Sequence, residues 1–480
     1  MNHRPVLYVI GLFLTALAKF MLIPVIYDLL TDDSGIWEFL AAAGVTLVTG
    51  AALTINFKPD TFNMKPRQVF VLTTLCWIAV SSFAALPFWF KLSVSYTDAF
   101  FETMSGITTT GSTVLTGLDY MDHSVLLWRS LLQWFGGIGF IVMAVAVLPF
   151  LKVGGMRLFQ SESSDWSEKA LPRSGSIAKR IILVYLIMTV LCAYLYYLGG
   201  MNGFEAINHS MSTVSTGGYS TSDASMGNFR SPFIIWTSTF FMILASLPFV
   251  LFVRGMRGEI DCLYKDTQVQ AFIGFLVCVW LVLGTWLCFH SQYSFFESLT
   301  LVSFNTTSTV TTTGYAYGDY SLWGAFANIA FFFLLFVGGC SGSTAGGIKI
   351  FRFQIGSKLL HIQLKQLVHP RACFVQTYNG QQISSEILRS LIGFTFFFIL
   401  LIALISLLLA LCGLDPITSV TGATTAVTNV GPGLGDIIGP AGNFSSLHDA
   451  AKWILSAGML LGRLEVITVL VLFTPAFWKG

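Results

Sequence analysis

The chain has 480 residues, of which 54% are hydrophobic and only 10% are charged, and its mean hydropathy is +0.73. This composition excludes an ordinary water-soluble domain and a disordered chain, because too few polar residues are present to cover or solvate a surface. The net charge of +2 gives no sign of a nucleic-acid partner, and the eight scattered cysteines include no C-x-x-C pair, which argues against a disulfide framework or a zinc site.

Ten apolar runs are long enough to predict membrane-spanning helices, for which about 18 uncharged residues suffice. They lie roughly at 5–30, 36–55, 68–90, 124–151, 178–200, 231–253, 268–290, 322–351, 386–412 and 449–478. The first run resembles a signal peptide, but Lys19 interrupts it and no small-residue cleavage site follows. We therefore expect a retained helix.

The charges are distributed unevenly between the two sides of the predicted membrane. Most of the 26 Lys and Arg residues fall at the chain ends or in the alternate loops 56–67, 152–180, 254–267 and 349–389. The opposite loops carry acids, namely Asp32, Asp33, Asp119, Asp122 and Asp223. The positive-inside rule then places both termini and the basic loops in the cytoplasm, which requires an even number of spans.

Four shorter segments rich in threonine and glycine lie between the long spans. They contain "DAFFETMSGITTTGST", "EAINHSMSTVSTGGYS", "ESLTLVSFNTTSTVTTTGYA" and "PITSVTGATTAVTNVGPG". The chain thus repeats a unit of helix, short helix, Thr/Gly turn and helix, after two extra N-terminal helices. Several short segments begin with helix-capping residues: Ser294 with Glu297, Asn202 with Glu205, and Asp415 before a proline.

A helix of about 12 residues rises about 18 Å, so each short segment must turn back near the middle of the membrane. Irregular backbone is tolerated there only where protein buries it or where it lines a water-filled cavity. Carbonyl oxygens can replace the hydration shell of an alkali cation, and glycine allows the backbone conformation that aligns them. Close helix packing is the alternative reason for threonine and glycine. Four repetitions favour a cation pore.

Four further stretches carry a family resemblance: "LQWFGGIGFIVMAVAVLPFL" (132–151), "GGCSGSTAGGIK" (338–349), "NVGPGLGD" (429–436) and "LLGRLEVITVLVLFTPAFW" (460–478). With the repeats, they make the whole chain resemble the Trk/Ktr superfamily of potassium transporters, closest to its Trk-type membrane subunit. The resemblance implies an all-α polytopic membrane protein. Four tandem M1–P–M2 units, each like a K⁺-channel subunit, would surround one pore, with two extra N-terminal transmembrane helices.

The expected units follow the repeats. They are 1–60 for the two extra helices, 61–157 for repeat 1, 158–258 for repeat 2, 259–371 for repeat 3 with an intramembrane gating loop at 338–347, and 372–480 for repeat 4.

The resemblance also implies a potassium filter made by the four turns. Its expected residues are Thr109, Thr110, Gly111, Ser215, Thr216, Gly217, Thr312, Thr313, Gly314, Asn429, Val430 and Gly431. The fourth turn has Asn-Val where the others have hydroxyl residues, so the symmetry is approximate. In relatives that pass sodium, a serine replaces the first filter glycine. Here all four positions are glycine, which indicates potassium.

The eighth predicted span is interrupted by a stretch that contains five glycines, and each glycine weakens a helix by about 1 kcal/mol. A phosphate-binding loop is excluded because Ile348, not lysine, follows Gly347. Helix packing is one explanation. The family resemblance implies another, an intramembrane gate below the filter that comprises Gly338, Gly339, Cys340, Ser341, Gly342, Ser343, Thr344, Ala345, Gly346, Gly347 and, in the last span, Arg463. An arginine at mid-membrane is a functional candidate. It can also serve structurally, by satisfying freed carbonyls.

The expected function is potassium uptake across the bacterial inner membrane through a channel-like pore. A K⁺ symporter coupled to H⁺ or Na⁺ is the alternative. An enzyme is disfavoured, because His209 beside Ser210 and Ser212 has no partner acid at a repeated spacing. K⁺ bound in the filter is the expected ligand, with no organic cofactor on this chain.

The family resemblance implies a homodimer and a cytoplasmic, NAD-binding regulatory subunit of the RCK type (TrkA-like). No nucleic acid is expected as a partner. The basic loops 152–180 and 349–389 would receive the regulatory subunit or contact anionic headgroups of the lipid bilayer.

Overall fold

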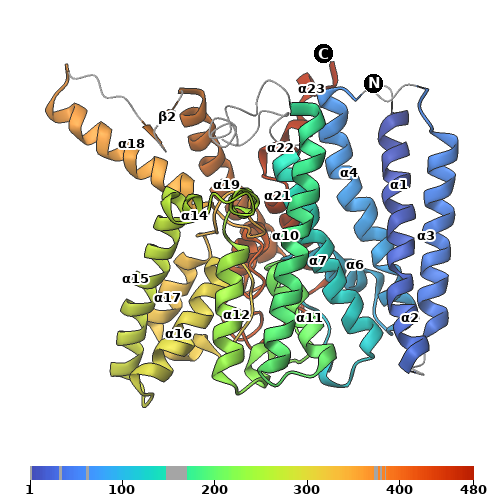
Figure 1. Ribbon diagram of the computed structural model, residues 1–480, viewed down its shortest axis with the longest axis horizontal. Helices are drawn as coiled ribbons and strands as arrows, with labels where there is room; N and C mark the ends of the chain where they lie inside the picture. Colours follow the sequence, from blue (N-terminus) through green and yellow to red (C-terminus); the bar gives the residue numbers. More distant parts are fainter. Residues whose placement is uncertain are drawn as a thin grey trace.

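The computed structural model describes residues 3–31, 35–60, 64–146, 170–371, 377–378, 381–383 and 385–479. Long helices form one bundle, and both chain termini lie at the same end of it, the upper end in Figure 1. We call this end the terminal face and the other end the opposite face. The predicted all-α fold is confirmed. Among the described residues the only strands are β1 (Thr377–Tyr378) and β2 (Gln381–Gln382), a two-residue antiparallel pair.

The two extra N-terminal helices are present. α1 (Arg4–Phe20) continues beyond Met21 as α2 (Leu22–Thr31), and α3 (Ile36–Asn56) returns beside them at one edge of the bundle (Figure 1). At the crossing of α1 and α3, a Cβ on Gly11 would lie 2.8 Å from the carbonyl oxygen of Gly50. Small residues allow two backbones to approach this closely.

Four similar units follow. The first comprises α4 (Pro66–Ala84), α5 (Leu86–Lys91), α6 (Tyr96–Ile107), η1 (Leu118–Tyr120) and α7 (His123–Ala146). The second comprises α10 (Ala170–Leu198), α11 (Gly203–Val214), η3 (Ser225–Asn228), α12 (Pro232–Ala245) and α13 (Phe249–Gly255).

The third unit comprises α14 (Asp261–Lys265), α15 (Thr267–His290), α16 (Phe295–Val310), η4 (Tyr320–Trp323), α17 (Ala325–Leu334) and α18 (Ile350–Val368). The fourth comprises α19 (Ser385–Leu411), α20 (Pro416–Thr428), α21 (Asp449–Arg463), α22 (Ile467–Leu470), η5 (Val471–Phe473) and α23 (Pro475–Lys479). α18 extends obliquely away from the bundle at the terminal face (Figure 1).

The prediction of ten continuous spans is wrong. Seven of the described helices are long and apolar enough to cross a membrane, and α12 with α13 makes an eighth if a pair bent by 92° counts as one span. The predicted runs 231–253, 322–351 and 449–478 are each broken. Hydropathy registers apolar residues but not these breaks, of which one lies at Pro248 and another in the glycine-rich stretch after α17.

The four short helices, α6, α11, α16 and α20, begin at the opposite face and end inside the protein. The predicted capping boxes of Asn202 with Glu205 and of Ser294 with Glu297 are both formed. The Asp415 carboxylate accepts from the N–H groups of Ile417 and Thr418. Hydrogen bonds from the side chain and backbone of Thr418 lower the pKa of Asp415, so the cap stays charged at neutral pH.

The predicted unit boundaries mostly fall outside the described residues. The boundary between 157 and 158 lies in the undescribed stretch 147–169, and residues 61 and 372 are likewise outside the description. The boundary between 258 and 259 falls between α13 and α14. The exact division into units stays a prediction.

Candidate ion-conduction site

Each short helix ends in the same backbone turn. The residues Thr109, Thr216, Thr312 and Asn429 have φ angles between 51° and 58°, a left-handed conformation that side chains other than glycine rarely adopt. The following N–H bonds to the carbonyl five residues earlier, at 2.8 Å from Thr110 to Ser105 and at 3.1 Å from Val430 to Thr425. The next glycine again has positive φ, namely Gly111, Gly218, Gly314 and Gly431. The repeats therefore agree in backbone conformation as well as in sequence.

The structure corrects the register of the second predicted triplet by one residue. The triplets that end at Gly111, Gly314 and Gly431 have the predicted register, whereas the second turn consists of Thr216, Gly217 and Gly218. Ser215 is the C-cap of α11 instead. The letters "STGG" permit either register, and only the backbone angles distinguish the two glycines.

The four glycines form a closed ring, in which each leaves room for a carbonyl of the next unit. A Cβ on Gly111 would meet the oxygen of Gly217, one on Gly218 that of Thr313, one on Gly314 that of Val430, and one on Gly431 that of Thr110. The last contact, at 2.6 Å, returns to the first unit. A side chain at any of the four glycines would therefore collide with backbone. Carbonyl oxygens gathered in this way suit a dehydrated alkali cation.

A cavity of about 260 Å³ adjoins this ring. Its lining comes from the segments that follow all four turns, including Ser112, Tyr219, Ala316 and Pro432. Gly218 lines it and Gly217 does not, which agrees with the corrected register. The cavity has room for several water molecules, so a hydrated ion can reach the ring from this side.

The loop between α17 and α18, residues 335–349, lies against the helix-end side of the same turns. The N–H of Gly346 donates to Oγ1 of Thr312 at 2.6 Å, and the N–H of Gly347 donates to the carbonyl of Thr428 at 2.8 Å. The predicted gate residues 338–347 all lie in this loop and are buried or half-buried. The loop is thus joined directly to two of the four turns.

Three other elements hold the loop. Cys340 N and Thr344 N donate to the carbonyls of Ser246 and Ala245, which are freed at the break between α12 and α13. Ser341 N donates to the Gln268 side chain of α15 at 2.8 Å. At the base of the loop, Gly338 N donates to the carbonyl of Ile348 at 2.9 Å. Non-helical backbone in this region therefore has its hydrogen bonds, as burial within a membrane protein requires.

Arg463 lies beside the loop, as predicted. Its Nη1 donates to the carbonyl of Thr344 at 3.0 Å, and its guanidinium carbon lies 4.1 Å from the Phe140 ring centroid. Nε and Nη2 of Arg463 are buried and have no hydrogen-bond partner among the described residues. The adjoining space, which Asn429, Gly346 and Arg463 help to line, measures only about 20 Å³. It holds about one water molecule.

Sequence reasoning missed several side chains at the site. Lys349 donates through Nζ to the carbonyl of Ala345, and Arg352 pairs with Glu465 at 3.0 Å. Gln133 of α7 donates to the carbonyl of Gly217 at 2.5 Å and accepts from Tyr219 N at 3.0 Å. These residues stand in ordinary-looking helices, and only Lys349, at the end of the glycine-rich stretch, had a sequence signal.

Residues 36–479 match the family model described as TrkH, cation transport protein. The chain is 49% identical over 477 residues to the Trk system potassium uptake protein TrkI of Halomonas elongata, covering 99% of this chain and 97% of that one. It is 36% identical to TrkH of Escherichia coli, with both chains covered in full. The crystal structure of the potassium transporter TrkH from Vibrio parahaemolyticus matches all of both chains with a TM-score of 0.93 at 34% identity.

Proposed function

The chain belongs to the TrkH family of cation transport proteins, and we propose that it takes up potassium through a channel-like pore whose filter is the ring of four glycine turns. The relatives described above are named potassium uptake proteins or a potassium transporter, which supports potassium as the cargo. The observation that carries the proposal is the closed ring, in which the glycine of each unit makes room for a carbonyl of the next.

The filter in this proposal uses Thr109 to Gly111, Thr216 to Gly218, Thr312 to Gly314 and Asn429 to Gly431, with K⁺ bound between them and no organic cofactor on the chain. Neutral carbonyl dipoles in a ring of fixed size favour an ion that loses its water at moderate cost. The four glycines are each required by a collision, which keeps the ring at one size.

The gate in this proposal is the loop 338–347 together with Arg463. The loop amides of Gly346 and Gly347 occupy oxygens of the third and fourth turns, so an ion leaving the ring meets peptide groups instead of water. Arg463 adds a buried positive charge beside that path, which raises the barrier for a cation. The arrangement has the features of a closed pore.

The membrane orientation and partners are also part of the proposal. The terminal face would be cytoplasmic in a bacterial inner membrane, because the basic loops lie with the termini. α18 follows the loop directly and carries the exposed Lys358 and Lys365, so a protein bound to α18 would pull on the loop. We propose a homodimer that binds an NAD-binding RCK-type subunit there; anionic lipid is the alternative contact.

A symporter on this fold would need a buried acid that is free to exchange a proton. The carboxylates buried in the described part of the chain each face a cation: Asp28 with Lys91, Glu102 with Arg129, and Glu465 with Arg352. This pairing favours a channel-like pore over H⁺ coupling.

Purified protein in liposomes tests the function. With a K⁺ gradient as the only driving force, K⁺ should enter until the gradient is dissipated, and an equal Na⁺ gradient should give much less flux. Empty liposomes with and without valinomycin set the two limits. K⁺ entry that occurs only when a H⁺ or Na⁺ gradient is imposed would replace the pore with a symporter.

A further inference from the structure

One position on each short helix links that helix to the segment after its turn. Nine residues before each ring glycine stand Glu102, His209, Asn305 and Gly422. The first three side chains bond to the segment that leaves the ring of their own unit, whereas Gly422 has no side chain to do so. The four units, alike in backbone, therefore differ in how the exit from the ring is held.

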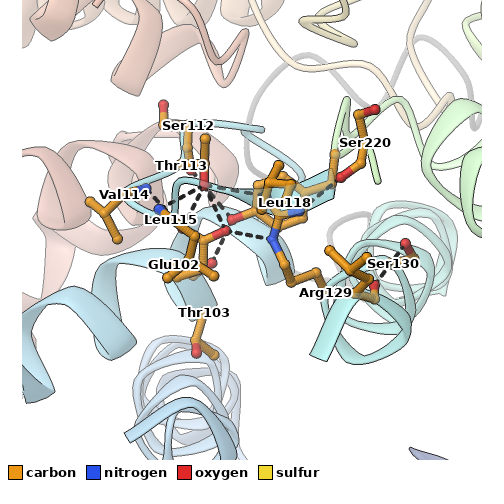
Figure 2. Close-up of polar contacts among 12 residues, drawn as sticks. Glu102, Thr103, Ser112, Thr113, Val114, Leu115, Leu118, Arg129, Ser130 and Ser220 are labelled. Atoms are coloured by element: carbon orange, nitrogen blue, oxygen red, sulfur yellow. Dashed lines mark hydrogen bonds and ion pairs between the residues drawn. The ribbon is translucent and has the colours of Figure 1, made fainter. Parts of the chain in front are cut away.

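The first unit has the strongest of these links, shown in Figure 2. The fully buried carboxylate of Glu102 accepts from the N–H of Val114 at 2.9 Å and from the hydroxyl of Thr113 at 3.0 Å. Arg129 of α7 donates to the same carboxylate through Nε at 2.8 Å. Hydrogen bonds to a charged acceptor are shorter and stronger than neutral ones, and burial increases the difference.

Arg129 also extends the link to the second unit. Its Nη1 donates to the carbonyl of Ser220 at 2.9 Å, two residues after Gly218. Its guanidinium lies 4.1 Å from the ring centroid of Tyr219, whose hydroxyl donates to the carbonyl of Glu102 at 2.7 Å. One ion pair thus joins the exits of two neighbouring turns.

The links in the other units are weaker. Nε2 of His209 lies 3.0 Å from the Ser220 hydroxyl. The Asn305 amide exchanges two hydrogen bonds with the backbone of Tyr317, at 2.9 and 3.0 Å. In the fourth unit the neighbouring Thr421 hydroxyl accepts from the N–H of Leu434 at 3.2 Å. The links therefore range from a buried ion pair to a single hydroxyl.

We propose that Glu102 and Arg129 are positioning residues that set the preference of the ring for potassium over sodium. The proposal rests on the proposed function, because it assumes that ions pass the ring. Neither side chain needs to touch the ion. The pair fixes the segments that leave Gly111 and Gly218, and so prevents the carbonyls of the first two turns from closing around the smaller ion.

The test compares four variants with the parent in liposomes. Glu102→Gln with Arg129→Gln removes the charges together, so no unpaired charge is left buried. Thr113→Val leaves the ion pair intact and removes one hydroxyl from the link. Asp98→Asn is the matched control, because Asp98 lies on the same helix and pairs with Lys452 at 2.6 Å without contacting a turn. Arg129→Lys keeps the charge but loses the fork.

The readouts are the K⁺/Na⁺ permeability ratio under bi-ionic conditions and the melting temperature. We expect the double variant to lower the ratio about tenfold, which is the effect of about 1.4 kcal/mol between the two ions. Thr113→Val and Arg129→Lys should each lower it by about threefold, a fraction of that difference. Asp98→Asn should lower the melting temperature and leave the ratio unchanged.

A folded double variant with the ratio of the parent would overturn the proposal. If the double variant does not fold, the proposal is equally overturned by folded Thr113→Val and Arg129→Lys proteins that both keep the ratio of the parent. A parent protein that conducts no K⁺ would contradict the proposed function instead, so the two failures are distinguishable.

Discussion

The glycine ring and the loop of residues 335–349 are both irregular backbone buried in the same molecule, yet they are built in different ways. The ring is made four times over, and each unit supports the next through a glycine and a carbonyl. The loop occurs in one unit and is held by single bonds to several unrelated elements, among them Ser246, Gln268, Thr312 and Arg463.

This difference in construction agrees with a difference in task. A closed set of identical contacts cannot change at one place without disturbing the others, which suits a binding site of fixed size. A loop held by separate bonds can leave its place while the ring stays intact. The space on either side agrees, with about 260 Å³ next to the ring and about 20 Å³ beside the loop and Arg463.

The largest effect is expected where the ring itself is changed. Gly111→Ser and Gly218→Ser each place a Cβ against a carbonyl of the next unit, at a positive φ that serine adopts poorly. The K⁺/Na⁺ permeability ratio should fall by roughly a hundredfold, or about 2.7 kcal/mol. Gly139→Ser on α7, where nothing lies within 4 Å of the added Cβ, is the control. Bi-ionic measurements that give all three variants the ratio of the parent would refute the filter assignment.

The next effect concerns the loop, whose loss should change the rate and not the selectivity. Deleting Ser341 to Ala345 removes the backbone that bonds to Arg463 and to α12, and so should undock Gly346 and Gly347 from the turns. We expect K⁺ flux to rise by about tenfold, as for a barrier lowered by about 1.4 kcal/mol. Flux is to be normalised to folded protein from size-exclusion chromatography. Equal flux in a well-folded deletion protein would exclude the loop as the gate.

Arg463 should contribute a smaller part of the same barrier. Arg463→Met removes the charge but keeps an unbranched side chain beside Phe140. K⁺ flux should rise about threefold, equivalent to about 0.7 kcal/mol, at a constant K⁺/Na⁺ ratio. The melting temperature separates this role from a structural one, because two of its nitrogens lack partners among the described residues. A lower melting temperature with unchanged flux would make Arg463 purely structural.

The smallest effect on conduction is expected at the terminal face. Charge reversal at Lys358 and Lys365 of α18, or at Arg254 and Arg257 after α12, should weaken binding of an RCK-type subunit by about tenfold, or about 1.4 kcal/mol. The basal flux and ratio should not change. Lys58→Glu, an exposed change after α3 and far from α18 in Figure 1, is the control. Undiminished pull-down by both pairs would place the docking surface elsewhere.

Repetition made much of the fold predictable from the sequence. The four short helices, their caps at Asn202, Ser294 and Asp415, and the register of three turns all follow from local patterns. The second turn failed because two adjacent glycines fit the same letters. The broken spans failed because hydropathy averages over a window and does not detect where backbone hydrogen bonding is interrupted.

The links around the ring could not be predicted for a different reason. Glu102 and Arg129 are 27 residues apart, and Arg129 reaches Ser220 across 91 residues. Neither residue stands out in its helix, and nothing local indicates that the two units meet there. Only the packing of α6 against α7, with the second turn beside them, brings these groups together (Figure 2).

Crystals of the protein grown in K⁺ and then exchanged into Tl⁺ would locate the permeating ion by its anomalous scattering. We expect Tl⁺ peaks inside the glycine ring, close to the carbonyl oxygens of Thr110, Gly217, Thr313 and Val430, and no such peaks after exchange into Na⁺. Peaks confined to other sites, such as the acids Asp119 and Asp223, with an empty ring, would contradict the filter proposed here.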